Sequence, residues 1–308
     1  MESQHDVSIV LVNYNQKEYT AQCLDSIYQN PPKASIEIVL VDNASHDSSA
    51  DWLERQYPKV KLVRSLANRG IAGGNNLGIQ NASGKYILLL NNDTLVKPGS
   101  IDFSLDFLES HPETAGVGGN LLNEDGSFQS SYCDFHSLWQ AFLIFTRLGW
   151  LFRRYYPSHP PTRTVKNVDW MSTAFMLFRR DALEAVGLVD EEYFIYSDET
   201  DLQYKLQQKG WKITYLPDLN TVHFGGKSLT PWRRRRLVYR GYLLFFHMHR
   251  GAARTVILRI FFCLVCLLKL TFWYIAWLLP PARQRAVDEF RSNQSILRMC
   301  LRPGIEAP

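Results

Sequence analysis

The chain has 308 residues, of which 46% are hydrophobic and 21% are charged. This length and composition exclude an intrinsically disordered chain and indicate one large or two smaller globular domains. The charge is unevenly divided, because residues 231–308 carry fourteen Lys or Arg and three Asp or Glu, whereas residues 1–230 carry 20 and 27. We therefore expect two regions with different roles, 1–230 and 231–308.

The N-terminus and the cysteines indicate a cytoplasmic protein. Residues 1–6 contain no basic segment followed by an apolar one, so the sequence predicts no secretion signal and a catalytic region that stays in the cytoplasm. The five cysteines are scattered and lack the spacing of a zinc site. We interpret them as reduced thiols, and Cys263 and Cys266, although they form a C-x-x-C motif, as small apolar residues within a hydrophobic stretch.

Strands alternate with helices over the first part of the chain. Short apolar runs that end in polar residues predict buried parallel strands, and apolar residues at helical spacing predict the helices between them. The predicted strands are 7–12, 36–41, 61–64 and 86–90, and the predicted helices are 20–28, 48–57 and one that ends near residue 81. This alternation is typical of a three-layer α/β fold with a mostly parallel sheet, whose strands present their carboxyl ends to ligands.

Polar residues follow these strands. Asn13 and Asn15 come after the first strand. Asp42 ends the second, where it would either hydrogen-bond a base or ribose or form an Asx turn. Asn92 and Asp93 follow the strand at 86–90, and Asp93 is a candidate metal ligand, with a turn residue or helix cap as the alternative.

A segment rich in Gly and Asn separates the third and fourth strands. It lacks both the G-x-G-x-x-G of dinucleotide folds and the G-x-x-x-x-G-K of phosphate loops. Its glycines nevertheless allow positive φ and a close approach of the backbone to a ligand, and Arg69 offers a charge for a diphosphate. We expect a loop from Asn68 to Asn76; a helix C-cap followed by a turn is the alternative.

The middle of the chain is less regular. The pattern predicts a helix at 101–110, a strand at 116–122, a turn at Asp125-Gly126, and an aromatic-rich loop or helix at 132–161 that could contact an acceptor or a membrane. An apolar strand at 168–178 then leads into a helix at 180–186.

Three carboxylates, Asp198, Glu199 and Asp201, open a predicted helix that ends at Gly210. Anionic side chains are favourable at a helix start, but capping explains only one of them, so we expect a general base among them. A strand at 211–216 comes next, and the loop after it contains His223, either a structural histidine or a ligand.

Together, these motifs resemble the family 2 inverting glycosyltransferases of GT-A fold, especially their rhamnosyltransferase-like members. The resemblance spans residues 7–228 and is carried by Val12-Asn13-Tyr14-Asn15, Val41-Asp42-Asn43-Ala44-Ser45, the Asn68–Asn76 segment, Leu90-Asn91-Asn92-Asp93-Thr94, and residues 190–202 with His223 after them. It implies transfer of a sugar from a nucleotide-diphosphate donor, with dTDP-rhamnose favoured and a UDP-sugar possible. The acceptor would be a hydroxyl of a glycan or a lipid-linked molecule in cell-surface polysaccharide synthesis.

The resemblance also implies site roles. Asp93, with His223, would hold Mg²⁺ or Mn²⁺, and Glu199 would be the catalytic base, with Asp198 beside it. The residues implied in nucleotide-sugar binding are Asn13, Asn15, Asp42, Asn68, Arg69, Gly74, Asn75 and Asn92, and those implied at the acceptor are Trp170, Thr173 and Asp201. Many relatives have Glu-Asp where this chain has Asp198-Glu199, and Gly where it has Thr173, so the sugar and acceptor pocket is expected to differ in detail.

The basic C-terminal region contains an apolar stretch, 256–279, that is long enough to span a bilayer. A Lys near the middle of a span costs about 2.5–3.5 kcal/mol, and Arg250, Arg254, Arg259 and Lys269 fall within about half of the helical wheel. We therefore favour a helix lying in the plane of the cytoplasmic leaflet and contacting membrane lipid over a single span; a buried core or dimer helix is the alternative.

The Arg run at 233–236 accompanies lipid-like hydrophobicity, so we expect no nucleic-acid partner. Two alternative functions stay open. One is a nucleotidyltransferase, disfavoured because the Gly-rich segment follows the third strand rather than the first. The other is a catalytically inactive, membrane-bound relative that binds a sugar nucleotide, which an intact Asp93 and Glu199 disfavour.

Overall fold

A computed structural model of the chain describes residues 5–152, 161–225, 230–302 and 304–305. The chain divides into two compact units. The sheet unit consists of Met1–Phe135, Ser158–Phe194 and Asp198–Gly225, and the helical unit of His136–Pro157, Ile195–Ser197 and Gly226–Pro308.

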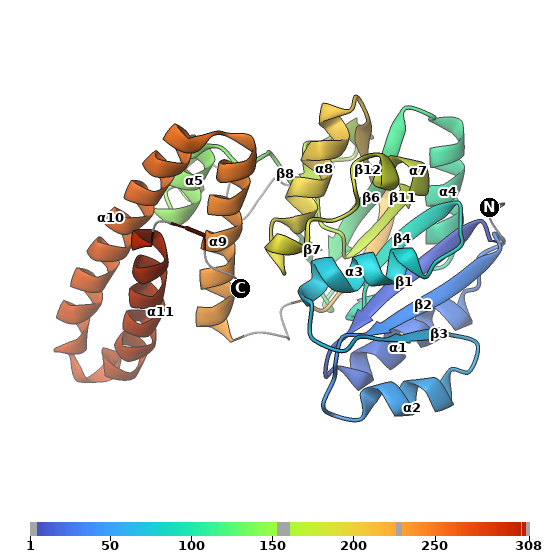
Figure 1. Cartoon of the computed structure of the whole chain (residues 1–308), viewed down its shortest axis with the longest axis horizontal. Helices are drawn as coiled ribbons and strands as arrows, with labels where there is room; N and C mark the ends of the chain where they lie inside the picture. The colour runs from blue at the N-terminus through green and yellow to red at the C-terminus, as the bar shows by residue number, and fades with distance from the viewer. Residues whose placement is uncertain (1–4, 153–160, 226–229, 303, 306–308) are drawn as a thin grey trace. The chain divides into compact units, whose positions relative to one another are not determined.

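A mixed β-sheet forms the centre of the sheet unit, with strands in the order β3-β2-β1-β4-β11-β6-β12-β5 (Figure 1). Strands β1 to β4 pair in parallel, whereas β11 runs antiparallel to both β4 and β6. The strands are β1 Val7–Asn13, β2 Ile36–Asp42, β3 Lys61–Arg64, β4 Tyr86–Asn91, β5 Thr94–Leu95, β6 Thr114–Leu122, β7 Phe128–Gln129, β9 Lys166–Asn167, β11 Phe175–Arg179 and β12 Lys212–His223. The parallel half matches the prediction, and the antiparallel strands make the whole sheet mixed.

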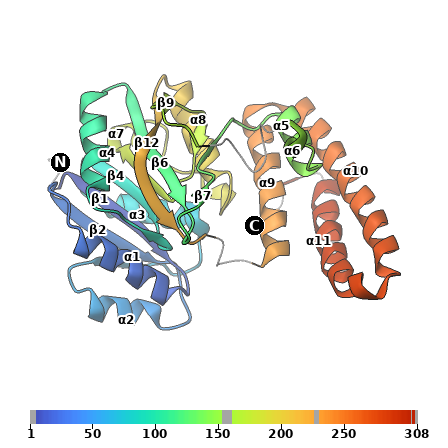
Figure 2. The same cartoon turned by 180° about the vertical axis from the view of Figure 1, so that it is seen from behind.

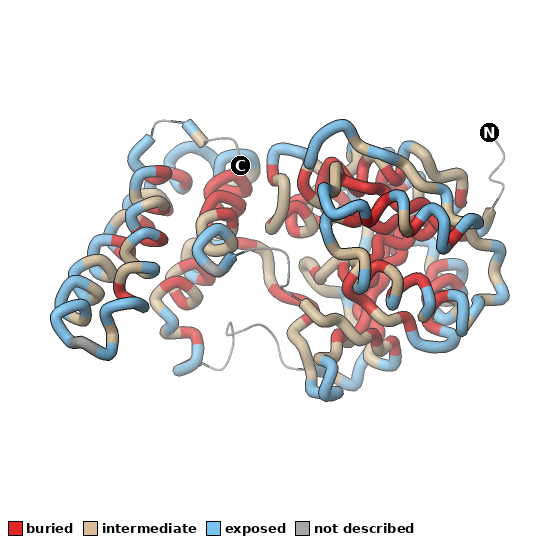
Figure 3. Tube along the Cα trace, turned by 90° about the horizontal axis from the view of Figure 1, so that it is seen from below, coloured by how far each residue is buried: buried red, intermediate tan, exposed pale blue. Residues whose placement is uncertain are grey.

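Helices cover both faces of this sheet and make the three layers. On one face α1, α2 and α4 pack against Val7, Ile9 and Leu11 of β1, and on the other α3, α7 and α8 pack near Val10. This division follows from the alternation of side chains along a strand. The helices are α1 Lys17–Gln29, α2 Ser49–Gln56, α3 Gly70–Gln80, α4 Ser100–Ser110, α7 Arg180–Ala185 and α8 Asp198–Gln208. Buried residues concentrate in the strands between the helical layers (Figure 3).

The predicted loop at 68–76 is wrong, because α3 already begins at Gly70. The carbonyl oxygen of Phe194 accepts hydrogen bonds from the N–H groups of Ile71 and Ala72 at the helix start. The glycines serve close packing instead of a loop: a Cβ at Gly74 would lie 2.7 Å from the Val12 side chain, and one at Gly78 2.3 Å from that of Val10. A distant carbonyl and tight packing on β1 thus stabilise a helix that local propensity disfavours.

Two predicted strands also have different bounds. The strand at 168–178 is broken into β10 (Trp170–Met171) and β11, because β10 pairs with β8 (Tyr132–Cys133) whereas β11 pairs with β4. The strand at 211–216 continues to His223 as β12, through an irregularity in its pairing with β6 between Leu216 and Asn220. This continuation brings His223 beside Thr94 of β5.

The helical unit contains α5 Leu138–Phe145, α6 Gly149–Phe152, α9 Pro231–His249, α10 Ala252–Trp277 and α11 Arg283–Leu301. Helices α10 and α11 lie side by side as a helical hairpin (Figure 2). Arg235 of α9 forms a bidentate ion pair with Glu289 of α11, with nitrogen–oxygen distances of 2.5 and 3.1 Å. The sequence pattern predicted no element after residue 279, so α11 is an addition. The Gly226–Ser228 part of the predicted loop lies outside the described residues.

Helix α10 is apolar and largely exposed. Within the described residues it is the one helix long and apolar enough to cross a membrane, and 28% of its most apolar window is buried. Arg259 and Lys269, which the sequence places on one half of the helical wheel, do not extend freely from α10. Arg259 donates to the carbonyl oxygens of Cys300 and Gly304 at 3.2 Å and to that of Arg302, and Lys269 Nζ lies 3.4 Å from the Tyr239 hydroxyl. Both cations instead satisfy polar groups of α9 and α11.

Candidate active site

The polar residues that follow the parallel strands lie along one edge of the sheet. Asn13 of β1 is opposite Asp42 of β2, and Val12 is opposite Asn91 of β4. Since parallel strands in register end together, the structure brings these predicted residues to a common edge, the usual place for a ligand in an α/β fold.

A buried hydrogen-bond network joins the ends of β4, β1 and β2. The Asn92 amide donates to the Thr20 hydroxyl, which donates to Asn13 Oδ1, both at 2.9 Å. Asn13 Nδ2 lies 3.3 Å from Asp42 Oδ1, and the other carboxylate oxygen of Asp42 accepts from the Ser45 N–H at 3.2 Å. Asp42 therefore forms the Asx-type turn as well as lying at the strand end, so the two readings of this residue are compatible.

Asp93 and His223, 130 positions apart in sequence, are neighbours in space. Strand β12 carries His223 to β5, and the Phe224 N–H donates to the Asp93 carbonyl oxygen at 2.9 Å. As a result, His223 Nε2 lies 3.3 Å from Asp93 Oδ1 and also 3.3 Å from Asn91 Nδ2.

The tautomer of His223 follows from its other ring nitrogen. Nδ1 lies 2.5 Å from Gln129 Oε1, and because an amide oxygen only accepts hydrogen bonds, Nδ1 carries the proton in this assignment. Nε2 then presents a lone pair toward the Asp93 carboxylate. An imidazole nitrogen and a carboxylate oxygen are ligand types of divalent cations.

The donor set at this point fits Mg²⁺ or Mn²⁺. In the described ranges, no group of three His, Cys, Asp or Glu side chains could hold a metal ion together, so Asp93 and His223 are a pair. Mg²⁺ is usually bound by one or two protein carboxylates while water and substrate phosphates fill its other positions. A two-residue site suits a cation that arrives with the diphosphate of a donor.

The start of α3 holds the next group of predicted residues. Asn68 Oδ1 accepts from the Gly70 N–H at 2.9 Å, and Gly74 packs on Val12. Arg69 forms a bidentate ion pair with Glu191, with nitrogen–oxygen distances of 2.9 and 2.8 Å. Both partners are more than a third exposed, so the pair is weak and a diphosphate could exchange for Glu191. The Asn75 side chain is buried and makes no hydrogen bond to a described residue.

The carboxylates that open α8 have different environments. Asp198 is buried and its Oδ1 has no hydrogen-bond partner within the described chain, whereas Glu199 is partly exposed. Burial, followed by the charge of Glu199, raises the pKa of Asp198 well above its ordinary value. Asp198 therefore favours its protonated form more strongly than an ordinary Asp does, and Glu199 is the more exposed of the two carboxyl groups.

The three predicted acceptor residues are not equivalent. Asp201 is completely buried, 3.0 Å from Lys205 Nζ and within 3.3 Å of the Tyr193 hydroxyl, so its carboxylate is not accessible to an acceptor in this structure. Trp170 is partly exposed and donates its indole N–H to the Asp134 carbonyl oxygen at 2.9 Å. Thr173 is also partly exposed, and the carbonyl oxygen of the next residue, Ala174, accepts from the Asn91 N–H.

Helix α8 is hydrogen-bonded to β10. The Gln203 amide makes two hydrogen bonds to the backbone of Met171, of 2.8 and 2.7 Å. Glu199 lies one turn before Gln203, and residues four apart share a helix face. The contact thus directs the Glu199 face of α8 toward the segment that contains Thr173, beside the carboxyl end of β4.

A strained segment leads into α8. Phe194, Tyr196 and Ser197 have φ of 64°, 69° and 66°, a region that non-glycine residues rarely adopt. Ser197 Oγ lies 3.0 Å from Nε2 of the buried His136. A Cβ on Gly241 of α9 would lie 2.6 Å from Ser197 Oγ, so only glycine lets α9 approach this segment. Residues 195–197 are thus part of the helical unit, and the next residue, Asp198, opens α8.

The sequence pattern did not reveal the roles of Gln129, Thr20 and His136. Gln129 orients His223, Thr20 joins Asn92 to Asn13, and His136 holds Ser197. Each of them contacts a residue far away in the chain. The one sequence feature that pointed to any of them is the predicted turn at Asp125-Gly126, after which β7, with Gln129, pairs with β6.

Comparisons with known proteins identify the fold. The chain is similar to the mannosyltransferase PcManGT from Pyrobaculum calidifontis in complex with GDP-Man and Mn²⁺ (TM-score 0.58, 16% identity, 96% of this chain and 87% of that one). It is also similar to GalNAc-T7 with UDP, GalNAc and Mn²⁺ (TM-score 0.58, 16% identity, 79% of this chain and 48% of that one). The chain therefore has the GT-A fold.

The family follows from sequence. Residues 8–187, more than half of the chain, match the family described as Glycosyl transferase family 2, and the chain belongs to this family. An N-acetylglucosaminyl-diphospho-decaprenol L-rhamnosyltransferase from Mycobacterium tuberculosis is 26% identical over 240 residues, covering 71% of this chain and 76% of that protein. The hexosyltransferase Agl10 of low-salt glycan biosynthesis from Haloferax volcanii is 23% identical, covering 71% and 67%. The protein is a glycosyltransferase.

Proposed function

We propose that this glycosyltransferase is a metal-dependent, inverting enzyme that moves a hexose, rhamnose by preference, from a nucleotide-diphosphate sugar to an acceptor hydroxyl in cell-surface polysaccharide synthesis. The observation that carries the proposal is the pairing of Asp93 with His223 at the sheet edge where the ends of β1, β2 and β4 meet. The similarity to the mycobacterial rhamnosyltransferase supports dTDP-rhamnose as donor, with UDP-sugars as the alternative.

Different residues at the sheet edge would bind different parts of the donor. Asp42, held by Asn13 and the Ser45 N–H, would bind the base or ribose, and Asn15 and Asn68 lie in the adjoining loops. Arg69 would exchange Glu191 for the diphosphate, and Gly74, Asn75 and Asn92 would also belong to the donor site. Asp93 Oδ1 and His223 Nε2 would hold Mg²⁺ or Mn²⁺. A bound divalent cation neutralises the charge that develops on the departing diphosphate.

The proton chemistry would belong to Glu199. Its carboxylate takes the proton of the acceptor hydroxyl while that oxygen attacks the anomeric carbon, and the bond from this carbon to the diphosphate oxygen breaks with its electron pair on the leaving nucleotide. Attack opposite the leaving group inverts the configuration, by analogy with inverting glycosidases. Burial raises the pKa of Asp198, which would limit the negative charge next to Glu199. Trp170 and Thr173 would line the acceptor side.

The enzyme would act at the cytoplasmic face of the cell membrane. Helix α10 supplies an exposed apolar surface, and the chain carries a basic C-terminal region next to it. A lipid-linked acceptor agrees with this placement and with the decaprenol-linked name of the mycobacterial relative. Membership of the family favours sugar transfer over the nucleotidyltransferase alternative.

The test is turnover of dTDP-, UDP- and GDP-sugars by the full chain with Mn²⁺, Mg²⁺ or EDTA and a membrane-extracted lipid acceptor. We expect transfer from one donor class, loss with EDTA, and a product with inverted anomeric configuration by NMR. Asp93→Ala should abolish transfer while thermal unfolding stays near that of the wild type. A product of retained configuration, or full activity of Asp93→Ala, would overturn the proposal, and donor binding without turnover would indicate an inactive relative.

A further inference from the structure

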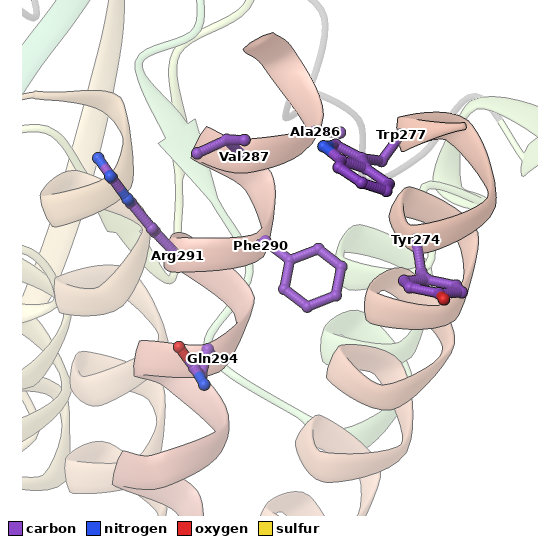
Figure 4. Close-up of a pocket in the computed structure, with 7 residues that line it drawn as sticks. All are labelled: Tyr274, Trp277, Ala286, Val287, Phe290, Arg291 and Gln294. Atoms are coloured by element: carbon purple, nitrogen blue, oxygen red, sulfur yellow. The ribbon is translucent and has the colours of Figure 1, made fainter. Parts of the chain in front are cut away.

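A cavity lies between α10 and α11, outside the candidate active site. Its volume is about 360 Å³, within the range of small-molecule sites. The residues that line it are Tyr274, Trp277, Ala286, Val287, Phe290, Arg291 and Gln294. The Phe290 ring lies between the two helices, on the side of Tyr274 and Trp277, whereas the Arg291 side chain extends from α11 in the opposite direction (Figure 4). The lining is thus mainly hydrocarbon and aromatic, with a cation on one side.

The surface around this cavity is also apolar. Every exposed residue from Val256 to Leu279 is uncharged, because Arg259 and Lys269 are turned toward partners in α9 and α11. The exposed large apolar side chains at this end of α10 are Phe272, Tyr274, Ile275, Trp277, Leu278 and Leu279. A contiguous apolar surface that runs into an apolar cavity is the expected environment of a hydrocarbon chain in a bilayer.

The charged side chains near the cavity complement a phosphate. Arg283 and Arg285 lie over the rings of Trp277 and Trp273, at 5.6 and 5.4 Å from the ring centroids. Arg291 is exposed and makes no ion pair or hydrogen bond with any described residue, so its guanidinium is available to an anion. Paired indole and guanidinium groups next to hydrocarbon are typical of a membrane interface.

We propose that this cavity binds one acyl chain of an anionic membrane phospholipid, whose phosphate is bound by Arg291. The proposal rests on the membrane association included in the proposed function, and not on the catalytic residues. Binding is noncovalent. The chain inserts beside Phe290, and the anionic headgroup lies at Arg291, the next residue of α11.

The test uses the full chain and vesicles of phosphatidylglycerol or phosphatidylcholine that contain a lipid with a diazirine in its acyl chain. After irradiation, we expect crosslinks mapped by mass spectrometry to concentrate within residues 274–294. Val287→Trp, which fills the cavity without removing apolar surface, should reduce these crosslinks about tenfold, whereas Leu268→Trp, on the exposed face of α10, should not. Arg291→Gln should lower the preference for phosphatidylglycerol about fivefold.

Several outcomes would overturn the proposal. Crosslinks spread evenly along α10 and unchanged in Val287→Trp would mean that the cavity is only part of a nonspecific surface. Complete displacement of the labelled lipid by an equimolar polyprenyl phosphate would assign the cavity to a lipid-linked acceptor instead. If the wild type does not sediment with vesicles, the protein does not associate with membranes and the proposed function loses that part. If the wild type sediments but is not labelled at residues 274–294, membrane association stands and only the lipid site in this cavity is refuted. If Val287→Trp does not fold, Arg291→Gln still decides between the outcomes.

Discussion

At the scale of single residues, Glu199 differs from its neighbour Asp198 in exposure rather than in chemistry. We expect Glu199→Gln to lower kcat by at least about 10²-fold, because the amide cannot accept the acceptor proton. Asp198→Asn should keep more activity, because burial raises the pKa of that carboxyl and disfavours its charged form. Initial rates of transfer check both, with Glu192→Gln, at an exposed position just before the segment, as the matched control. Equal losses in the two variants would contradict the assignment of the base.

Gln129 supplies a second residue-scale prediction. It holds the proton of His223 on Nδ1 and so leaves Nε2 unprotonated, as a cation ligand must be. Gln129→Leu should raise the half-saturating Mn²⁺ concentration about 10- to 100-fold, which is the usual effect of removing a residue that hydrogen-bonds a metal-binding histidine. A titration of activity with Mn²⁺ measures this change. The prediction fails if the variant loses kcat at saturating Mn²⁺ while its Mn²⁺ dependence stays the same.

His136 makes stability depend on pH. Burial lowers its pKa to about 3, so the folded chain keeps it neutral while the unfolded chain binds a proton below about pH 6.5. Stability should therefore fall as pH decreases from about 6.5 toward 3, by up to about 1.4 kcal/mol per pH unit. Denaturant unfolding at pH 7 and 5.5 should show this loss in the wild type and less of it in His136→Gln. His247→Gln, at an exposed position, should behave like the wild type.

At the scale of elements, α9 packs closely against residues 196–197, which lead into α8. Gly241→Ala would place a Cβ 2.6 Å from Ser197 Oγ and 2.8 Å from the Tyr196 carbonyl oxygen, so residues 196–197 must shift. Because Asp198 and Glu199 follow directly, we expect kcat to fall about 10- to 100-fold with little change in donor KM.

The control for Gly241 is Gly304→Ala, whose added Cβ meets no atom within 4 Å. Steady-state kinetics at varied donor concentration separate kcat from KM in both variants. A purely structural effect would lower thermal stability and leave the kinetics of the folded fraction unchanged, and that result would contradict a link from α9 to the base.

At the scale of the whole molecule, α10 gives the protein an apolar surface that has no exposed charge from Val256 to its end. Leu264 and Leu268 are exposed, so the double variant Leu264→Asp, Leu268→Asp should fold yet lose vesicle binding, because an Asp at the centre of a membrane helix costs about 2.5–3.5 kcal/mol. Co-sedimentation with vesicles checks this, and hydrolysis of the donor should persist.

Phe103→Asp is the matched control, because Phe103 is an exposed apolar residue on α4 of the sheet unit. It should sediment with vesicles like the wild type. If the double variant still sediments to the same extent, α10 is not the membrane surface, and an interface between protein molecules becomes the better interpretation.

The sequence by itself determined the alternation of strands and helices up to β4 and the residues at the strand ends. These features are local: apolar runs set the strands, helical spacing sets α1 and α2, and parallel strands necessarily end together, so Asn13, Asp42 and Asp93 could be assigned to one edge. The five motifs were also sufficient to indicate the family, which the match over residues 8–187 confirms.

Only the tertiary structure decided the rest, because it depends on partners distant in the chain. The Phe194 carbonyl starts α3 at Gly70, where local propensity indicated a loop, and β12 continues past Pro217 to bring His223 to Asp93. Carbonyl groups near the end of α11 turn Arg259 inward. The sequence records which side chains are charged. The direction in which each of them points depends on which distant polar groups still need a hydrogen-bond partner in the folded chain.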